Sequence, residues 1–95
     1  MYKLSTTKRF DKALKLCKKR DYPIDELRKA IAILVEKGCL PPEYKPHILH
    51  GNHEGEWEAH IKPDWLLIWE QNDDELTLLM LTTGTHSDIF GKTKR

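Results

Sequence analysis

WLLIW, residues 65–69, is an unbroken apolar run in the second half of this 95-residue sequence. Its length is that of a buried strand. It falls far short of the roughly 20 apolar residues that a membrane-spanning helix needs. Turn-forming residues precede it at positions 63–64 and follow it at positions 72–74, where a hairpin loop is expected. We therefore predict that this run forms the central strand of a sheet.

The segments around this run also predict strands. Between Trp57 and Lys62, apolar residues alternate with polar ones, which is the period of a half-buried strand. Residues 75–82 predict the next strand, and residues 2–5 alternate weakly and predict a short edge strand. A meander of about three strands is therefore expected in the second half of the chain, with one short helical turn over residues 86–90.

The first half of the sequence has the spacing of two helices. Apolar residues recur at helical intervals from Phe10 to Cys17, after a capping threonine at position 6 or 7, and again from Leu27 to Val35. Pro23 suits the first turn of the second helix, and Gly38 is a natural stop. The prolines of the linker 40–46 are expected to exclude a helix there.

This order of elements predicts one α+β domain over residues 1–95. Two N-terminal helices should pack on one face of a small, mainly antiparallel sheet. The start of the chain has no apolar segment typical of a secretion signal, so we expect a cytoplasmic protein without a membrane anchor. A disulfide between Cys17 and Cys39 is possible in principle, but two reduced thiols are the expectation in that compartment.

The formal charge of +1 conceals a strong asymmetry. Residues 1–40 hold eleven basic and five acidic side chains, residues 43–90 hold two lysines and ten acids, and the tail over residues 91–95 is basic. A basic N-terminal half suits contact with nucleic acid or with an acidic partner. Lysines on a helix form a solvated face by default, but three of them on the first helix are predicted to contact RNA: Lys12, Lys15 and Lys19.

All five histidines lie between positions 47 and 86, in the acidic half. His60 falls on the polar face of its strand, Asp64 lies just beyond it, and His86 follows a strand and a glycine turn. His47 precedes the first strand of the meander, so these four side chains can converge at one edge of the sheet. Such a cluster suits RNA cleavage, because the RNA supplies its 2′-hydroxyl as nucleophile and imidazole acts as base or acid near neutral pH. This chemistry needs no metal or cofactor.

Plainer interpretations of the histidines stay open. His50 and His53 occupy a polar loop with two glycines and are expected to be solvated surface residues. The spacing of three between His47, His50 and His53 also permits a zinc site, although no cysteine accompanies them. The residues alone thus predict a soluble α+β domain with an acid–base cluster.

Three short motifs mark the second half of the chain: HIKPDWLLIW at residues 60–69, TGTHSDIF at residues 83–90 and YKPH at residues 44–47. They resemble, in order and spacing, the H-I-x-P-D-W-L-L-I-Y, T-G-(T/S)-H-(S/A)-x-L-F and Y-x-x-H motifs of YafQ-type toxins in the RelE/ParE superfamily. With the length and the order of elements, the resemblance covers nearly the whole chain.

The resemblance implies a RelE-like fold and a ribosome-dependent endoribonuclease that cuts messenger RNA. It also implies a cognate antitoxin that wraps and blocks the protein in a toxin–antitoxin hetero-oligomer. Matched by motif, His47, His60, Asp64 and His86 form the acid–base set, and Phe90 stacks on a nucleotide base. The preferred assignment has His60 or His47 as base, His86 as acid and Asp64 orienting or tuning it, and the choice of base stays open.

The sequence departs from the family pattern at two arginines. One usually stands two or three residues before the histidine of the first motif, where this chain has Trp57 and Glu58. Another often precedes the T-G-T-H motif, where residues 79–82 of this chain read LMLT. Arginines at these places would stabilise the charge of the phosphorane. The alternative is therefore a non-catalytic or weakened toxin-fold protein that acts by binding, as a ParE-like inhibitor or within an antitoxin–operator complex.

Overall fold

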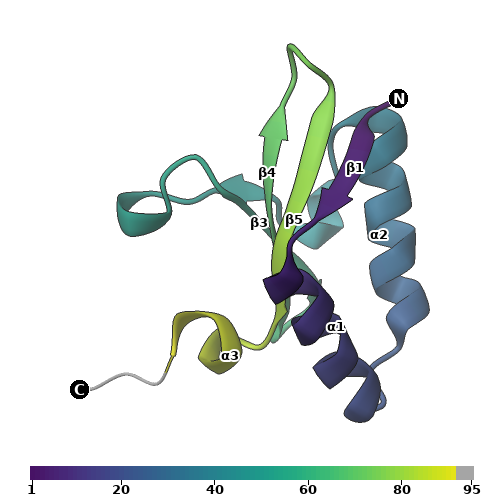
Figure 1. The fold of residues 1–95 in the computed structure, drawn as a ribbon, viewed down its shortest axis with the longest axis vertical. Coiled ribbons are helices and arrows are strands. Elements are labelled where there is room, and N and C mark those ends of the chain that lie inside the picture. The colour runs from purple at the N-terminus through teal and green to yellow at the C-terminus, as the bar shows by residue number, and fades with distance from the viewer. Residues whose placement is uncertain (92–95) are drawn as a thin grey trace.

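The predicted central strand lies in the middle of a five-stranded sheet in the computed structural model, which describes residues 1–91 (Figure 1). The strands are β1 (Lys3–Thr6), β2 (His47–Ile48), β3 (Trp57–Lys62), β4 (Trp65–Asn72) and β5 (Thr77–Gly84). Their order across the sheet is β1-β5-β4-β3-β2. Neighbouring strands pair antiparallel, except that β1 and β5 run parallel. The prediction of a small, mainly antiparallel sheet is confirmed.

Two helices, α1 (Lys8–Lys19) and α2 (Ile24–Lys37), follow β1 and cover one face of the sheet (Figure 1). The Thr7 side chain caps α1 by accepting a hydrogen bond from the backbone N–H of Phe10 at 2.9 Å. Gly38 ends α2 in the left-handed conformation. A third, short helix, α3 (His86–Phe90), follows β5. No helix within residues 1–91 is long and apolar enough to cross a membrane.

Two connections differ from the predictions. The prolines of the linker were expected to exclude any helix, but Pro42–Tyr44 form a 3-10 turn, η1. Proline fits there, because the first residue of a helical turn has no intrahelical partner for an N–H. A second 3-10 turn, η2 (Gly51–His53), precedes β3. β5 begins at Thr77 rather than at Glu75, because the Asn72 side chain accepts a hydrogen bond from the Glu75 N–H at 2.9 Å and prolongs the turn.

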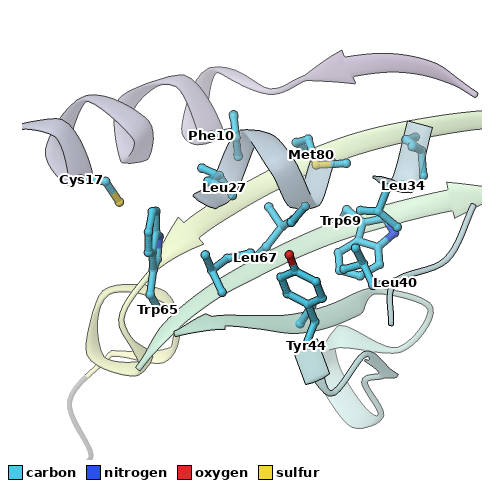
Figure 2. Close-up of a cluster of buried hydrophobic side chains, with 14 residues drawn as sticks. Phe10, Cys17, Leu27, Leu34, Leu40, Tyr44, Trp65, Leu67, Trp69 and Met80 are labelled. Carbon is cyan, nitrogen blue, oxygen red and sulfur yellow. The ribbon is translucent and has the colours of Figure 1, made fainter. Parts of the chain in front are cut away.

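The core lies between the helices and the sheet (Figure 2). On β4, Trp65, Leu67 and Trp69 point toward the helices and are at most 2% exposed. Their partners from the other elements include Phe10, Cys17, Leu27, Leu34 and Met80. The alternate residues Leu66 and Ile68 are also buried, on the opposite face of the strand. Burial on both faces explains why this strand is a continuous apolar run.

The two cysteines are free thiols, one buried and one exposed. Cys17 belongs to the core, and burial raises the pKa of its thiol. Cys39 lies on the surface just after α2. Cys17 therefore acts as a small apolar core residue.

Gly38 offers a test of how the end of α2 packs. A Cβ atom at this position would lie 2.5 Å from Cε1 of Tyr2, and φ is +73°. We expect Gly38→Ala to lower the free energy of unfolding by about 2–3 kcal/mol, from left-handed strain plus overpacking, as measured by urea denaturation.

Gly51→Ala is the matched control for this test. Gly51 has a similar φ of +78°, but nothing lies within 4 Å of the added Cβ. This variant should lose only the backbone contribution of about 1 kcal/mol. Equal losses in the two variants would show that the contact with Tyr2 contributes nothing.

Candidate active site

Three of the predicted histidines come together on the face of the sheet opposite the helices. On β3, the core residue Ala59 lies between Glu58 and His60, which therefore point to the other face. The register of the sheet places His47 of β2 directly opposite Glu58, and α3 brings in His86 after the end of β5. The ring centroid of His60 lies 6.5 Å from that of His47 and 6.0 Å from that of His86. His60 is thus the central member of the row.

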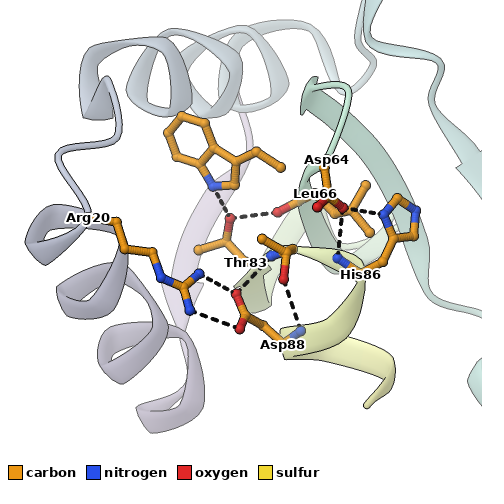
Figure 3. A network of polar contacts seen from close by, with 8 residues as sticks. Arg20, Asp64, Leu66, Thr83, His86 and Asp88 are labelled. Atoms are coloured by element: carbon orange, nitrogen blue, oxygen red, sulfur yellow. Dashed lines mark hydrogen bonds and ion pairs between the residues drawn. The ribbon is translucent and has the colours of Figure 1, made fainter. Parts of the chain in front are cut away.

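Asp64 pairs with His86 (Figure 3). Its Oδ1 atom accepts hydrogen bonds from Nδ1 of His86 at 2.6 Å and from the His86 backbone N–H at 3.0 Å. The hydrogen bond from the His86 side chain lowers the pKa of Asp64, and the one from the His86 backbone N–H adds a smaller effect. The ionised carboxylate therefore holds the imidazole in one orientation and leaves Nε2 for exchange of a proton with a ligand.

A buried carboxylate, Glu58, contacts the other two histidines. It is 6% exposed, and its Oε1 atom lies 3.1 Å from Nε2 of His47 and 3.7 Å from Nε2 of His60. The Nδ1 atoms face backbone carbonyls, that of Lys45 at 2.9 Å from His47 and that of Pro63 at 3.3 Å from His60. The His47 ring is thus held between two acceptors, whereas the His60 ring is held at Nδ1 alone. Sequence reasoning missed Glu58, although its place two residues before His60 puts both on one strand face.

Phe90 and His53 extend the row of rings. The Phe90 ring lies 6.4 Å from that of His86 and 5.3 Å from that of His53, measured between centroids. Nδ1 of His53 contacts Oε1 of Glu56 at 3.1 Å, which holds the imidazole in place. His53 lies in the loop as expected, with its side chain 38% exposed, but it also contacts Glu56 and Phe90, whereas His50 is exposed. The path of the loop decides this difference, and no local pattern reveals it.

The geometry does not support the zinc interpretation of three evenly spaced histidines. His47 faces Glu58, whereas His53 faces Phe90, so the two rings do not share a centre. Within residues 1–91, no group of three or more His, Cys, Asp or Glu side chains is arranged to hold a metal ion. A spacing of three residues therefore does not bring these side chains together outside a helix.

Both lysines and arginines lie close to the site. A surface pocket of about 300 Å³ beside His60 is lined in part by Lys45 and Lys62, which sequence reasoning did not single out. Of the arginines within residues 1–91, Arg9 and Arg20 contact α3, which carries His86 and Phe90, and Arg28 pairs within α2. The lysines for which RNA contact was predicted are all exposed on α1: Lys12, Lys15 and Lys19.

Known proteins share both this sequence and this fold. The mRNA interferase toxin YafQ of Escherichia coli strain K12 is 36% identical over 83 residues, which cover 86% of this chain and 88% of that protein. The crystal structure of YafQ from Escherichia coli strain BL21(DE3) matches with a TM-score of 0.88 and 32% identity, over 96% of this chain and 100% of that one. A chain of the Escherichia coli DinJ–YafQ complex matches with a TM-score of 0.86 and 33% identity, over 96% of this chain and 100% of that one.

These matches confirm the predicted fold, with two N-terminal helices on one face of the sheet. Residues 2–91 also match the family described as bacterial toxins of type II toxin–antitoxin systems, YafQ. Because the family match spans almost the whole chain and a relative is 36% identical over most of it, this protein belongs to the YafQ family of bacterial toxins.

Proposed function

We propose that this protein is a messenger-RNA interferase, an endoribonuclease that cuts message on the ribosome and serves as the toxin of a toxin–antitoxin pair. The observation that carries the proposal is a pair of histidine–carboxylate groups, one around Glu58 and one at Asp64. The ring centroid of His60 lies 6.5 Å from that of His47 and 6.0 Å from that of His86. The relative in Escherichia coli bears the name mRNA interferase toxin, which supports the same activity.

The first step is removal of the proton from the RNA 2′-hydroxyl, and we assign it to His60. Its Nδ1 donates to the Pro63 carbonyl, so Nε2 is the basic nitrogen. At 3.7 Å from Glu58, this Nε2 is too far away to be tied up in a hydrogen bond. His47 is less suited, because both of its nitrogens face acceptors at 2.9 and 3.1 Å. The buried carboxylate of Glu58 stabilises the imidazolium that forms on His60.

The second step is protonation of the departing oxygen. The 2′-oxygen bonds to the adjacent phosphorus, and the bond from that phosphorus to the 5′-oxygen breaks. His86 donates its Nε2 proton to the 5′-oxygen, while Asp64 holds its Nδ1 side. The products are a 2′,3′-cyclic phosphate and a 5′-hydroxyl end, and solvent exchange resets the two histidines. Protein groups thus perform both proton transfers, without a metal or cofactor.

Charge and stacking hold the RNA in place. Lys45 and Lys62 beside His60 take the role of the family arginines that this chain lacks, by stabilising the charge of the phosphorane. Phe90, 43% exposed, stacks on a base, a contact typically worth ~1–3 kcal/mol. The exposed lysines of α1 contact the phosphate backbone of RNA on the ribosome: Lys12, Lys15 and Lys19.

The partners follow from the same assignment. A cognate antitoxin binds the protein in a hetero-oligomer, a proposal supported by the likeness to a chain of the DinJ–YafQ complex. The other partners are the ribosome and its bound message, so the protein acts in the cytoplasm. Eleven basic side chains within residues 1–40 suit both an acidic antitoxin segment and ribosomal RNA.

The test is a cleavage assay on ribosomes loaded with a defined message. We expect cuts that leave 5′-hydroxyl and 2′,3′-cyclic phosphate ends, at the same rate after the protein has been dialysed against a chelator. A message with a 2′-deoxynucleotide on the 5′ side of the cut should resist cleavage there, because the nucleophile is missing. Cutting of the deoxy message would contradict the mechanism. No cutting of any message would favour the alternative of a protein that acts only by binding.

A further inference from the structure

α3 carries two residues of the proposed site, His86 and Phe90, yet none of its five residues is buried. A helix this short gains little stability from its own hydrogen bonds. Contacts outside the core therefore hold it. We propose that the ion pair between Arg20 of α1 and Asp88 of α3 positions this helix, and through it His86, for catalysis. This inference rests on the proposed RNA cleavage and names two positioning residues for it.

The ion pair is bidentate (Figure 3). The two terminal nitrogens of Arg20 donate to Oδ2 and Oδ1 of Asp88 at 2.6 and 3.1 Å. Two parallel hydrogen bonds fix the relative orientation of the guanidinium and carboxylate planes, which a single contact does not. The side chains are 35% and 25% exposed, so solvent screens the pair only partly. Arg20 stands at the C-terminal end of α1, whose core contacts make it a rigid support.

The same carboxylate also organises the start of α3. Oδ2 of Asp88 accepts from the Thr85 backbone N–H at 2.9 Å, and the Asp88 N–H donates to the Thr85 hydroxyl at 3.1 Å, which together form a capping box. A Cβ atom at Gly84 would lie 2.8 Å from Oδ2, so the glycine leaves room for this approach. One carboxylate thus joins α1, the end of β5 and the first turn of α3.

The ion pair between Arg20 and Asp88 persists at neutral pH. The hydrogen bonds from Arg20 are the main cause that lowers the pKa of Asp88 to about 2. Desolvation opposes this shift, and the hydrogen bonds with Thr85 add to it. Because this pKa is depressed, the stabilisation is present above the ordinary aspartate pKa of about 3.9 and is lost only as the pH falls toward 2. His86 therefore sits between two ionised carboxylates, Asp64 on its ring and Asp88 on its helix.

A competing role for Arg20 is direct contact with an RNA phosphate. In that case Asp88 would compete with the RNA, and Asp88→Asn would free the guanidinium and strengthen binding. Positioning predicts the opposite outcome, because the asparagine retains an acceptor for the Thr85 N–H but loses the charge that holds α3 to α1. Asp88→Asn therefore separates the two roles without touching Arg20.

The experiment measures single-turnover cleavage of ribosome-bound message by the parent, Arg20→Gln, Asp88→Asn and the double variant. Each single change should lower the maximal rate about 10- to 100-fold, with the half-saturating concentration changed by less than about twofold. The double variant should be no slower than the slower single variant, because both remove one interaction. Asp25→Asn is the matched control. This variant removes the same charge from Asp25, which is 95% exposed and lies 3.6 Å from Arg28 on α2. It should cut at the parental rate.

A structural readout accompanies the rates. Heteronuclear NOE values for the amides of Thr85–Phe90 should fall in Asp88→Asn and stay unchanged in Asp25→Asn. Parental cleavage by Asp88→Asn, or a loss confined to the half-saturating concentration, would overturn the inference. If the parent itself cuts no message, the proposed function fails and the catalytic part of the inference fails with it. The NOE values then still decide whether the pair holds α3.

Discussion

Replacing His86 with glutamine is expected to slow message cleavage by about 10²–10⁴-fold, the usual contribution of a general acid. Glutamine is similar in size to histidine, and the backbone N–H of residue 86, which donates to Asp64 at 3.0 Å, is retained. The glutamine side chain has no group that exchanges a proton near neutral pH. The loss in this variant therefore reports proton donation rather than collapse of the site. Single-turnover rates on loaded ribosomes measure it.

A matched control sharpens this prediction. His50→Gln is the control, because His50 is an exposed histidine of the nearby loop. It should cut like the parent. A His86→Gln rate within about threefold of the parental one would remove His86 from the role of acid.

Local patterns were enough to predict most of the fold. The apolar run of β4, the alternation of β3 and the helical spacing in α1 and α2 each report burial of a nearby segment, and the structure has all of them. The parallel pairing of β1 with β5 has no such signal. It joins Lys3 to Thr77, and it depends on how the two intervening helices fold back onto the sheet.

The site was less predictable, because its geometry comes from contacts between distant segments. Motifs pointed to His60, Asp64 and His86, but Arg20 and Asp88 lie 68 residues apart and share no pattern. Net charge over the second half of the chain was also a poor guide. Three acids at the site are paired, Glu58 and Asp64 with histidines and Asp88 with arginine. The net charge of a segment therefore does not show which of its acids are paired at the site.

Glu58→Gln is expected to slow cleavage on the order of 10²-fold, although this side chain need not touch the substrate. The buried carboxylate lies 3.7 Å from Nε2 of His60, the proposed base, and 3.1 Å from Nε2 of His47. Glutamine fills the same volume but replaces a negative charge by a neutral amide. Two effects then combine. The imidazolium that forms on His60 loses its counter-charge, and the amide N–H₂ group turns a donor toward ring nitrogens that faced an acceptor.

This loss should appear in the maximal rate, since the counter-charge matters once the proton has moved to His60. The half-saturating concentration should change little, because the lysines and Phe90 that we propose to bind RNA are untouched. Glu54→Gln is the matched control, as it makes the same chemical change at an exposed residue of the preceding loop, and it should cut like the parent. Thermal melts of both variants separate a lost charge from a lost fold. A folded Glu58→Gln protein with the parental rate would mean that the proton of the 2′-hydroxyl leaves by a route that does not use the Glu58-supported histidines.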